Sequence, residues 1–153
     1  MGSRLTAEKR SVAASDGVEI EYEVLGAGPP ILLVHGGFAG RSTFSRQHSL
    51  AERYRLIIPS SRGHDGTDGR LPVSFGFATT EVDDLHAVLE AEGVSRAHML
   101  GHSTGGATAF AFARRSPVHV DHLVLIEPTL LPILPPHPAR GSGRAVPLDH
   151  RSW

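Results

Sequence analysis

The sequence predicts an α/β fold, with a mainly parallel sheet, flanking helices and an antiparallel hairpin at the N-terminus. Short apolar runs alternate along the chain with stretches of helical periodicity, which is typical of repeated strand–helix units that build a parallel sheet. The first run instead alternates apolar with polar residues, as in a strand that has one face in water. The 153 residues are enough for one domain of ordinary size.

The composition excludes several classes of protein. Fifteen Lys and Arg residues against sixteen Asp and Glu give a net charge of −1, whereas a nucleic-acid-binding domain carries a basic surplus on one face. The absence of Cys excludes disulfides, thiolate nucleophiles and Cys-based metal clusters. No apolar run approaches the roughly 18 residues of a membrane span, and no apolar segment follows the charged N-terminus as in a secretory signal. We therefore expect a cytoplasmic protein with no cofactor, no nucleic-acid partner and no membrane partner.

The first predicted structure is a β-hairpin. Asp16-Gly17 lies between two strand-like runs, residues 10–14 and 18–24. An Asp-Gly pair between such runs is a strong turn signal. The alternation in the second run predicts a strand with one wet face.

Four apolar runs predict the strands of the parallel sheet. They comprise residues 31–34, 56–58, 97–100 and 123–126. These runs are continuous rather than alternating, and most are bounded by Gly or Pro. We therefore expect strands that are buried on both faces.

Between these runs the sequence predicts three helices, over residues 43–53, 79–91 and 105–115. The second is the clearest, because its apolar residues recur at helical spacing on one face. Thr80 and Asp83 approximate a capping box at its start, and Gly93 is placed to end it.

The composition changes near Pro128. Residues 132–153 hold five of the eleven Pro residues and few residues that could be buried. This composition predicts an extended or disordered Pro- and Arg-rich tail. Residues 1–131 accordingly form the folded part.

The sharpest chemical signal is the segment Gly101-His102-Ser103-Thr104-Gly105, which has the pattern Gly-x-Ser-x-Gly between a predicted strand and a predicted helix. Such a turn holds the Ser in a strained backbone conformation with its side chain exposed, and the Gly residues avoid collisions. The helix N-terminus supplies free N–H groups. This context predicts Ser103 as a nucleophile, and an ordinary hydroxyl in a Gly-rich turn is the alternative.

A second signal, His35-Gly36-Gly37-Phe38, directly follows a predicted strand. A turn with two Gly residues lets backbone N–H groups point into the crevice, where an acyl-transfer enzyme needs two donors for the oxyanion. The N–H of Gly37, or of Phe38, and the N–H of Thr104 are the predicted donors. His35 is expected to brace the loop rather than to act as a base.

With these motifs, the hairpin and the loop at residues 60–67, the chain resembles the α/β-hydrolase fold family. The matching parts occur in the family's order over residues 10 to about 131, roughly the front half of a full-length member. The family's loop usually has an acid, one further residue and then Arg-Gly-His-Gly. Here Ser60 replaces the acid and Asp65 replaces the second Gly, which predicts altered packing of this loop.

The resemblance implies a chemistry. It implies a serine nucleophile at Ser103, an oxyanion hole at Gly37 and Thr104, and hydrolysis of an ester-like bond in a small-molecule substrate. In this family the nucleophile is followed along the chain by an acid and then by a His.

Glu127 ends the last predicted strand and is the acid that the resemblance suggests. Some relatives, including haloalkane dehalogenases, place their acid at the end of that strand, although their Asp nucleophile argues against dehalogenation here. The alternative for Glu127 is a charged residue that leaves the sheet into solvent. His137 and His150 follow in the tail, but nothing in the sequence holds either one beside Ser103.

Three other His residues are less suited to the role of base. His119 and His122 precede the last strand, so they are expected at the opposite end of the sheet, and His102 is expected to pack at the elbow. His119-x-x-His122 would present both rings to a metal only on a helix. A short turn into a strand is expected there, so no metal site is predicted.

Two functions stay open. The first is serine-nucleophile hydrolysis of an ester-like bond. The alternative is a catalytically inactive, truncated or frame-shifted hydrolase fragment that lacks the triad His. In that case the last strand would leave an open apolar sheet edge, which predicts self-association.

Overall fold

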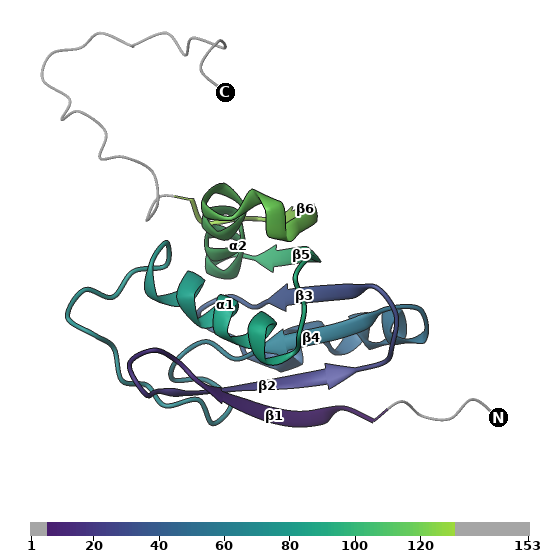
Figure 1. Cartoon of the computed structure of the whole chain (residues 1–153), viewed down its shortest axis with the longest axis horizontal. Helices are drawn as coiled ribbons and strands as arrows, with labels where there is room; N and C mark the ends of the chain where they lie inside the picture. Colours follow the sequence, from purple (N-terminus) through teal and green to yellow (C-terminus); the bar gives the residue numbers. More distant parts are fainter. Residues whose placement is uncertain (1–5, 131–153) are drawn as a thin grey trace, which may run out of the picture.

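A computed structural model describes residues 6–130 and confirms the predicted α/β class. The described strands form one mixed sheet in the order β1-β2-β4-β3-β5-β6 (Figure 1). The strands are β1 (Glu8–Ala13), β2 (Glu19–Leu25), β3 (Pro30–Val34), β4 (Arg55–Pro59), β5 (Ala97–His102) and β6 (Val120–Ile126). The α-helices are α1 (Thr80–Ala91) and α2 (Thr104–Arg115), and the 3₁₀ helices are η1 (Arg41–Glu52) and η2 (Pro117–His119).

The N-terminal hairpin forms as predicted. β1 and β2 pair antiparallel, from Glu8 opposite Val24 to Ala13 opposite Glu19. Gly17 in the turn has a φ of 79°, a left-handed value that side chains disfavour. β2 then pairs antiparallel with β4, and β4, β3, β5 and β6 are parallel neighbours. Because these four strands are parallel, the loops that follow them meet at one rim of the sheet.

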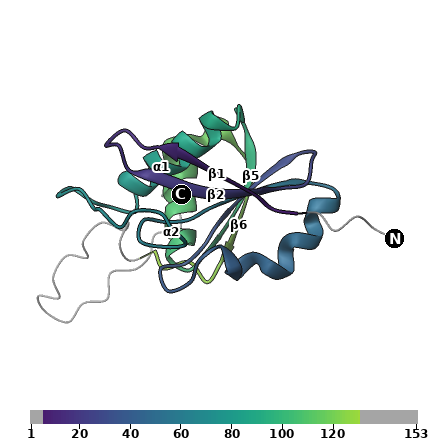
Figure 2. The same ribbon diagram turned by 90° about the horizontal axis from the view of Figure 1, so that it is seen from below.

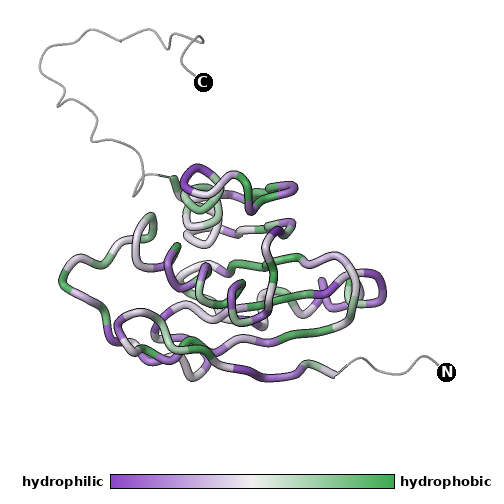
Figure 3. The backbone as a smooth tube through the Cα atoms, viewed as in Figure 1, coloured by the Kyte–Doolittle hydropathy of each residue, from purple (hydrophilic) through white to green (hydrophobic). Residues whose placement is uncertain are grey.

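Helices cover both faces of the sheet. Seen from below, α1 and α2 lie on one side of the sheet and η1 lies on the other (Figure 2). Phe112 of α2 is fully buried on the first side, and Phe44 of η1 is buried on the second. The most hydrophobic stretches of the chain run along the central strands, where both layers meet the sheet (Figure 3).

The prediction of strands buried on both faces is confirmed for the central strands and is wrong for the last one. Leu33 in β3 and Ile57 in β4 are fully buried. In β6, however, Val124 and Ile126 are 50% and 42% exposed. β6 lies at the edge of the described sheet, and only its other face, with Leu123, packs against the main core.

The start of α1 also differs from the prediction. Thr80 is the first residue of the helix rather than its cap, and no side chain caps this end. A capping box needs its Thr at the cap position, which Thr79 occupies instead, and the carboxylate of Asp83 pairs with Arg115 on α2 at 2.7 Å. Gly93, with a φ of 64°, follows the helix as predicted. The tail predicted at residues 132–153 lies outside the described residues.

Candidate active site

The turn between β5 and α2 has the strained geometry expected of a nucleophile elbow. Ser103 has φ 55° and ψ −123°, a conformation that costs a non-Gly residue roughly 1–3 kcal/mol. Side chains on the flanking Gly residues would collide with backbone. A Cβ on Gly101 would lie 2.6 Å from the carbonyl oxygen of Gly105, and one on Gly105 would strike the carbonyl oxygens of Val34 and His35. The predicted reason for both Gly residues is therefore confirmed.

The backbone of Ser103 is tied to the chain that leaves β6. Its N–H donates to the carbonyl of Ile126 at 3.0 Å, and its own carbonyl accepts from the N–H of Thr129 at 3.0 Å. These two bonds hold the strained residue in place. The side chain is half-buried, and its Oγ lies 3.4 Å from the hydroxyl of Thr129.

The Gly-Gly turn after β3 lies against this elbow. A Cβ on Gly36 would lie 3.0 Å from the Cβ of Ser103 and 3.4 Å from Nδ1 of His102. A Cβ on Gly37 would lie 3.3 Å from the hydroxyl of Thr104. The absence of side chains thus lets the turn approach the elbow closely, at the same rim of the sheet.

Two imidazoles orient the peptide groups of this turn. Nδ1 of His35 lies 2.8 Å from the carbonyl oxygen of Gly36, and Nε2 of His64 lies 2.9 Å from that of Gly37. In a planar trans peptide the N–H points away from the C=O. The contacts therefore fix the directions of the next two N–H groups, those of Gly37 and Phe38.

His35 is neutral in this arrangement. Its Nε2 accepts the N–H of Ser61 at 3.0 Å, so its proton is assigned to Nδ1, which donates to the turn. Burial of the ring lowers the pKa of His35, which favours the same neutral form. The predicted loop-bracing role of His35 is therefore confirmed.

Three N–H groups are free to act as donors at this rim. Among residues 6–130, those of Gly37 and Phe38 have no hydrogen-bond acceptor, while the Phe38 side chain is fully exposed. Thr104 is the first residue of α2, so its N–H has no acceptor within the helix, and the positive end of the helix dipole lies beside it.

The loop after β4 is held by Asp65, one of its two departures from the family pattern. Asp65 has a φ of 47°, and its carboxylate accepts from the Ser60 hydroxyl at 3.2 Å and from the Arg41 N–H at 2.7 Å. The carboxylate of Asp65 thus contacts Ser60, the position at which the family pattern has an acid. Gly40 gives it room, because a Cβ there would collide with the carboxylate.

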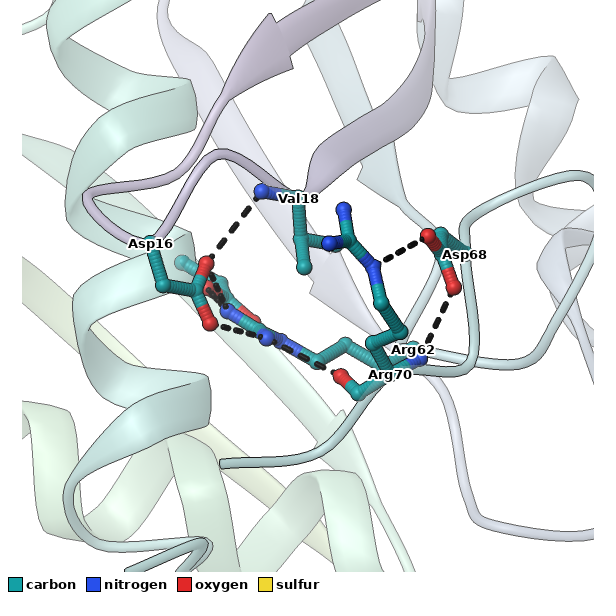
Figure 4. A network of polar contacts seen from close by, with 6 residues as sticks. Asp16, Val18, Arg62, Asp68 and Arg70 are labelled. Carbon is teal, nitrogen blue, oxygen red and sulfur yellow. Dashed lines mark hydrogen bonds and ion pairs between the residues drawn. The ribbon is translucent and has the colours of Figure 1, made fainter. Parts of the chain in front are cut away.

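The Arg of this loop is the buried centre of an ion-pair network that reaches the surface at Asp16 (Figure 4). Arg62 donates two bonds of 2.8 Å to Asp84 on α1 and two bonds of 2.6 and 3.1 Å to Asp16 in the hairpin turn. A fifth bond of 3.1 Å goes to the carbonyl of Arg70. All five guanidinium N–H groups are satisfied, so the loop is fixed to both the hairpin and α1.

The predicted acid lies near the elbow but forms no contact with it. Glu127 follows β6 directly, with a φ of 44°, and the strand residue before it pairs with His102. Its carboxylate is exposed and makes no hydrogen bond or ion pair within residues 6–130. It is two residues from Thr129, whose hydroxyl is the nearest described side-chain partner of Ser103.

None of the His residues considered for the role of base is brought to Ser103 in the described part of the chain. His119 and His122 lie at the opposite end of β6, as expected from the strand register, and His102 forms no hydrogen bond with the hydroxyl through its Nδ1. His137 and His150 lie outside the described residues. No group of three or more His, Asp or Glu residues suited to a metal occurs between residues 6 and 130.

Sequence reasoning missed Thr129, His64 and Glu81 at this site. The Glu81 carboxylate accepts from the Thr108 hydroxyl at 2.6 Å and joins α1 to α2 one turn beyond the elbow. Its burial raises the pKa of Glu81. His64 stands in the loop motif quoted above, but only the fold shows that it reaches the Gly-Gly turn.

The chain matches the family model described as the alpha/beta hydrolase fold over residues 29–147, and it belongs to that family. It is 33% identical to Lipase 1 of Psychrobacter immobilis over 124 residues, which are 78% of this chain and 38% of the lipase. It is 30% identical to the 2-hydroxy-6-oxo-2,4-heptadienoate hydrolase of Pseudomonas putida over 128 residues, 81% of this chain and 46% of that hydrolase.

Solved structures agree with this assignment. An esterase from Rhodococcus sp. ECU1013 superposes with a TM-score of 0.72 at 31% identity, over 80% of this chain and 46% of the esterase. A bacterial membrane phospholipase A gives a TM-score of 0.73 at 30% identity, over 80% of this chain and 40% of that enzyme. The chain therefore spans less than half the length of these relatives. None of its described helices has the length and hydrophobicity to cross a bilayer.

Proposed function

We propose that the chain carries the nucleophile and oxyanion hole of a serine hydrolase that cleaves ester-like bonds in small molecules. The observation that carries the proposal is the strained backbone of Ser103, φ 55° and ψ −123°, beside a Gly-Gly turn whose Gly37 and Phe38 N–H groups have no acceptor among residues 6–130. The relatives described as lipases and esterases support the same reaction class.

In this reaction the Ser103 Oγ forms a bond to the carbonyl carbon of the ester, and its proton passes to a base. The carbonyl electron pair moves to the oxygen, which the N–H groups of Gly37 or Phe38 and of Thr104 stabilise. Collapse of the intermediate breaks the bond to the leaving alcohol, which takes the proton, and water then hydrolyses the acyl-enzyme. One oxyanion donor is typically worth about 10²–10³ in kcat.

Glu127 is proposed as the acid that orients the base. The base itself is a His, for which His137 and His150 remain the only residues after Glu127. The alternative function follows if neither serves, because loss of a triad member removes most of the rate while the oxyanion hole alone retains about 10³–10⁴ over water. The chain is then a catalytically inactive hydrolase fragment.

The full chain should be incubated with a p-nitrophenyl short-chain ester and, in parallel, with a fluorophosphonate that labels active serines. Ser103→Ala is the test variant, and Ser45→Ala, an exposed serine on η1, is the matched control. We expect hydrolysis and labelling in the parent and the control and neither in Ser103→Ala. Equal rates in all three proteins would overturn the assignment of Ser103.

The same assay separates the two functions. Turnover that falls at least tenfold in Glu127→Gln, and in one of His137→Ala and His150→Ala, supports a complete triad within this chain. Absence from the parent of both labelling and turnover above the uncatalysed rate supports the inactive fragment instead.

A further inference from the structure

Two imidazoles on neighbouring strands form a pair that the proposed hydrolase does not use. His98 lies on β5 and His122 on β6, at the opposite end of these strands from Ser103. Their Nδ1 atoms are 3.1 Å apart, and their ring centroids are 5.1 Å apart. The pair therefore directs two nitrogen atoms at one point.

A β-bulge creates this arrangement. Ala97 is opposite Val120 and Met99 is opposite Leu123, so one residue of β5, His98, faces two residues of β6. Val120 and Leu123 both pack toward the main core because of the extra residue. Bulges change the direction of side chains in this way. Here the bulge lies at the place where the His122 ring contacts the His98 ring.

The described pair is a hydrogen bond between two imidazoles, in which one Nδ1 donates and the other accepts. Both nitrogen atoms thus aim at the position of the shared proton. If the donating ring carries its proton on Nε2 instead, both Nδ1 lone pairs are free, and a metal about 2.0–2.1 Å from each nitrogen would lie beside the line that joins them. Two neutral imidazole nitrogens are preferred ligands of Zn²⁺, Cu²⁺ and Ni²⁺.

We propose that His98 and His122 form a binding site for a late first-row divalent cation such as Zn²⁺. With Zn–N bonds of about 2.0–2.1 Å, a separation of 3.1 Å corresponds to an N–Zn–N angle of about 100°. A tetrahedral angle needs a separation of about 3.3–3.4 Å, which ring movements of a few tenths of an ångström supply. The inference is independent of the proposed hydrolase function.

Of the two proposed ligands, His98 is packed against the protein and His122 faces solvent. His98 is half-buried, and the Tyr54 ring packs against it edge-on at 6.3 Å between centroids. His122 is exposed, so a hydrated ion can reach the pair from solvent. Since the described residues provide no third His, Asp or Glu at this place, water would complete the coordination.

The test is a titration of the full chain, free of any His tag, with Zn²⁺ by isothermal calorimetry and by long-range ¹H–¹⁵N NMR of the His rings. His98→Ala and His122→Ala are the test variants. His48→Ala on η1 is the control, because the chain holds ten His residues and removal of any one lowers nonspecific binding slightly.

We expect the tightest Zn²⁺ event in the parent and in His48→Ala to weaken at least tenfold in both test variants. In the parent, the Nδ1 resonances of both rings should shift together at a stoichiometry of one ion per chain. Unchanged isotherms in both variants, or Nδ1 shifts confined to other His residues, would overturn the site. The NMR measurement on the parent decides the question even if a variant fails to fold.

Discussion

The two ends of the sheet are held together by different interactions. At the β1 end, the Glu92 carboxylate forms ion pairs with Arg10, at 2.8 Å, and with Arg55. Only 1% of the Glu92 side chain is exposed. At the β6 end, the apolar side chains of Val124 and Ile126 are exposed instead. Charged groups therefore join separate elements at one end, while apolar surface remains uncovered at the other.

This difference bears on what each edge can do. β1 presents the exposed charges of Glu8 and Lys9 along its length, and charged residues on an edge strand oppose pairing with another chain. β6 has no such protection from residue 122 to residue 126, and it pairs only with β5 in the described sheet. The first end is expected to govern stability and the second to govern association.

The largest effect is expected from breaking the Arg62 network, which joins the turn of the β1–β2 hairpin to α1. Arg62→Ala would leave the buried carboxylate of Asp84 without its partner and release the hairpin turn at Asp16. Removal of one partner of a buried ion pair costs about 3–5 kcal/mol. Urea unfolding followed by circular dichroism measures this loss.

The control is Arg70→Ala, which removes an exposed ion pair with Asp68 next to the same network (Figure 4). An exposed pair is worth about 0–1 kcal/mol, and the carbonyl that Arg62 contacts is retained. Equal destabilisation by the two substitutions would contradict the difference drawn between buried and exposed pairs.

Much of the fold was predictable because its signals are local. The Asp16-Gly17 turn, the alternation in β2 and the elbow at Gly101–Gly105 each depend on a few neighbouring residues. An open edge at β6 was expected only under the fragment alternative. The exposed faces of Val124 and Ile126 were not predicted, because a continuous apolar run has the same pattern in a central strand and in an edge strand. The start of α1 at Thr80 differs from the predicted cap by one residue, and a sequence pattern does not fix a helix end that closely.

The candidate site divides in the same way. Spacing along the chain predicted that Ser103, Gly37 and Thr104 would share one rim, because parallel strands end at the same side of a sheet. It could not predict Thr129 or His64, since their contacts arise from the paths of loops. The roles of Glu127 and of the catalytic base stay predictions.

A smaller, pH-dependent effect is expected at Glu81, which joins α1 to α2. Burial raises its pKa, while the Thr108 hydroxyl opposes that shift, Asp84 adds to it and His64 reduces it. The pKa of Glu81 is thus higher in the folded chain than in the unfolded chain, where it is near 4.5. Below the unfolded-state pKa the carboxyl is protonated in both states and its contribution to stability is complete. That contribution is lost as the pH rises through the folded-state pKa. Glu81→Gln abolishes this dependence.

The stability of Glu81→Gln relative to the parent should therefore increase from pH 4 to pH 8 in urea titrations, by less than the effect of Arg62→Ala. Glu90→Gln, an exposed residue of the same helix, is the matched control for the loss of a carboxyl group. A pH dependence of Glu81→Gln no larger than that of the control would contradict the assignment of the buried carboxyl.

The smallest change in stability, within about 0.5 kcal/mol, is expected for Val124→Lys, because the side chain is half exposed. Its effect on association should be large, since we expect the parent to self-associate through β6 and a Lys on an edge strand opposes such pairing. Sedimentation velocity over a range of concentrations measures this, with Val73→Lys, a fully exposed loop position, as the matched control. If the parent stays monomeric throughout, or if both variants dissociate it equally, the open edge is not the contact.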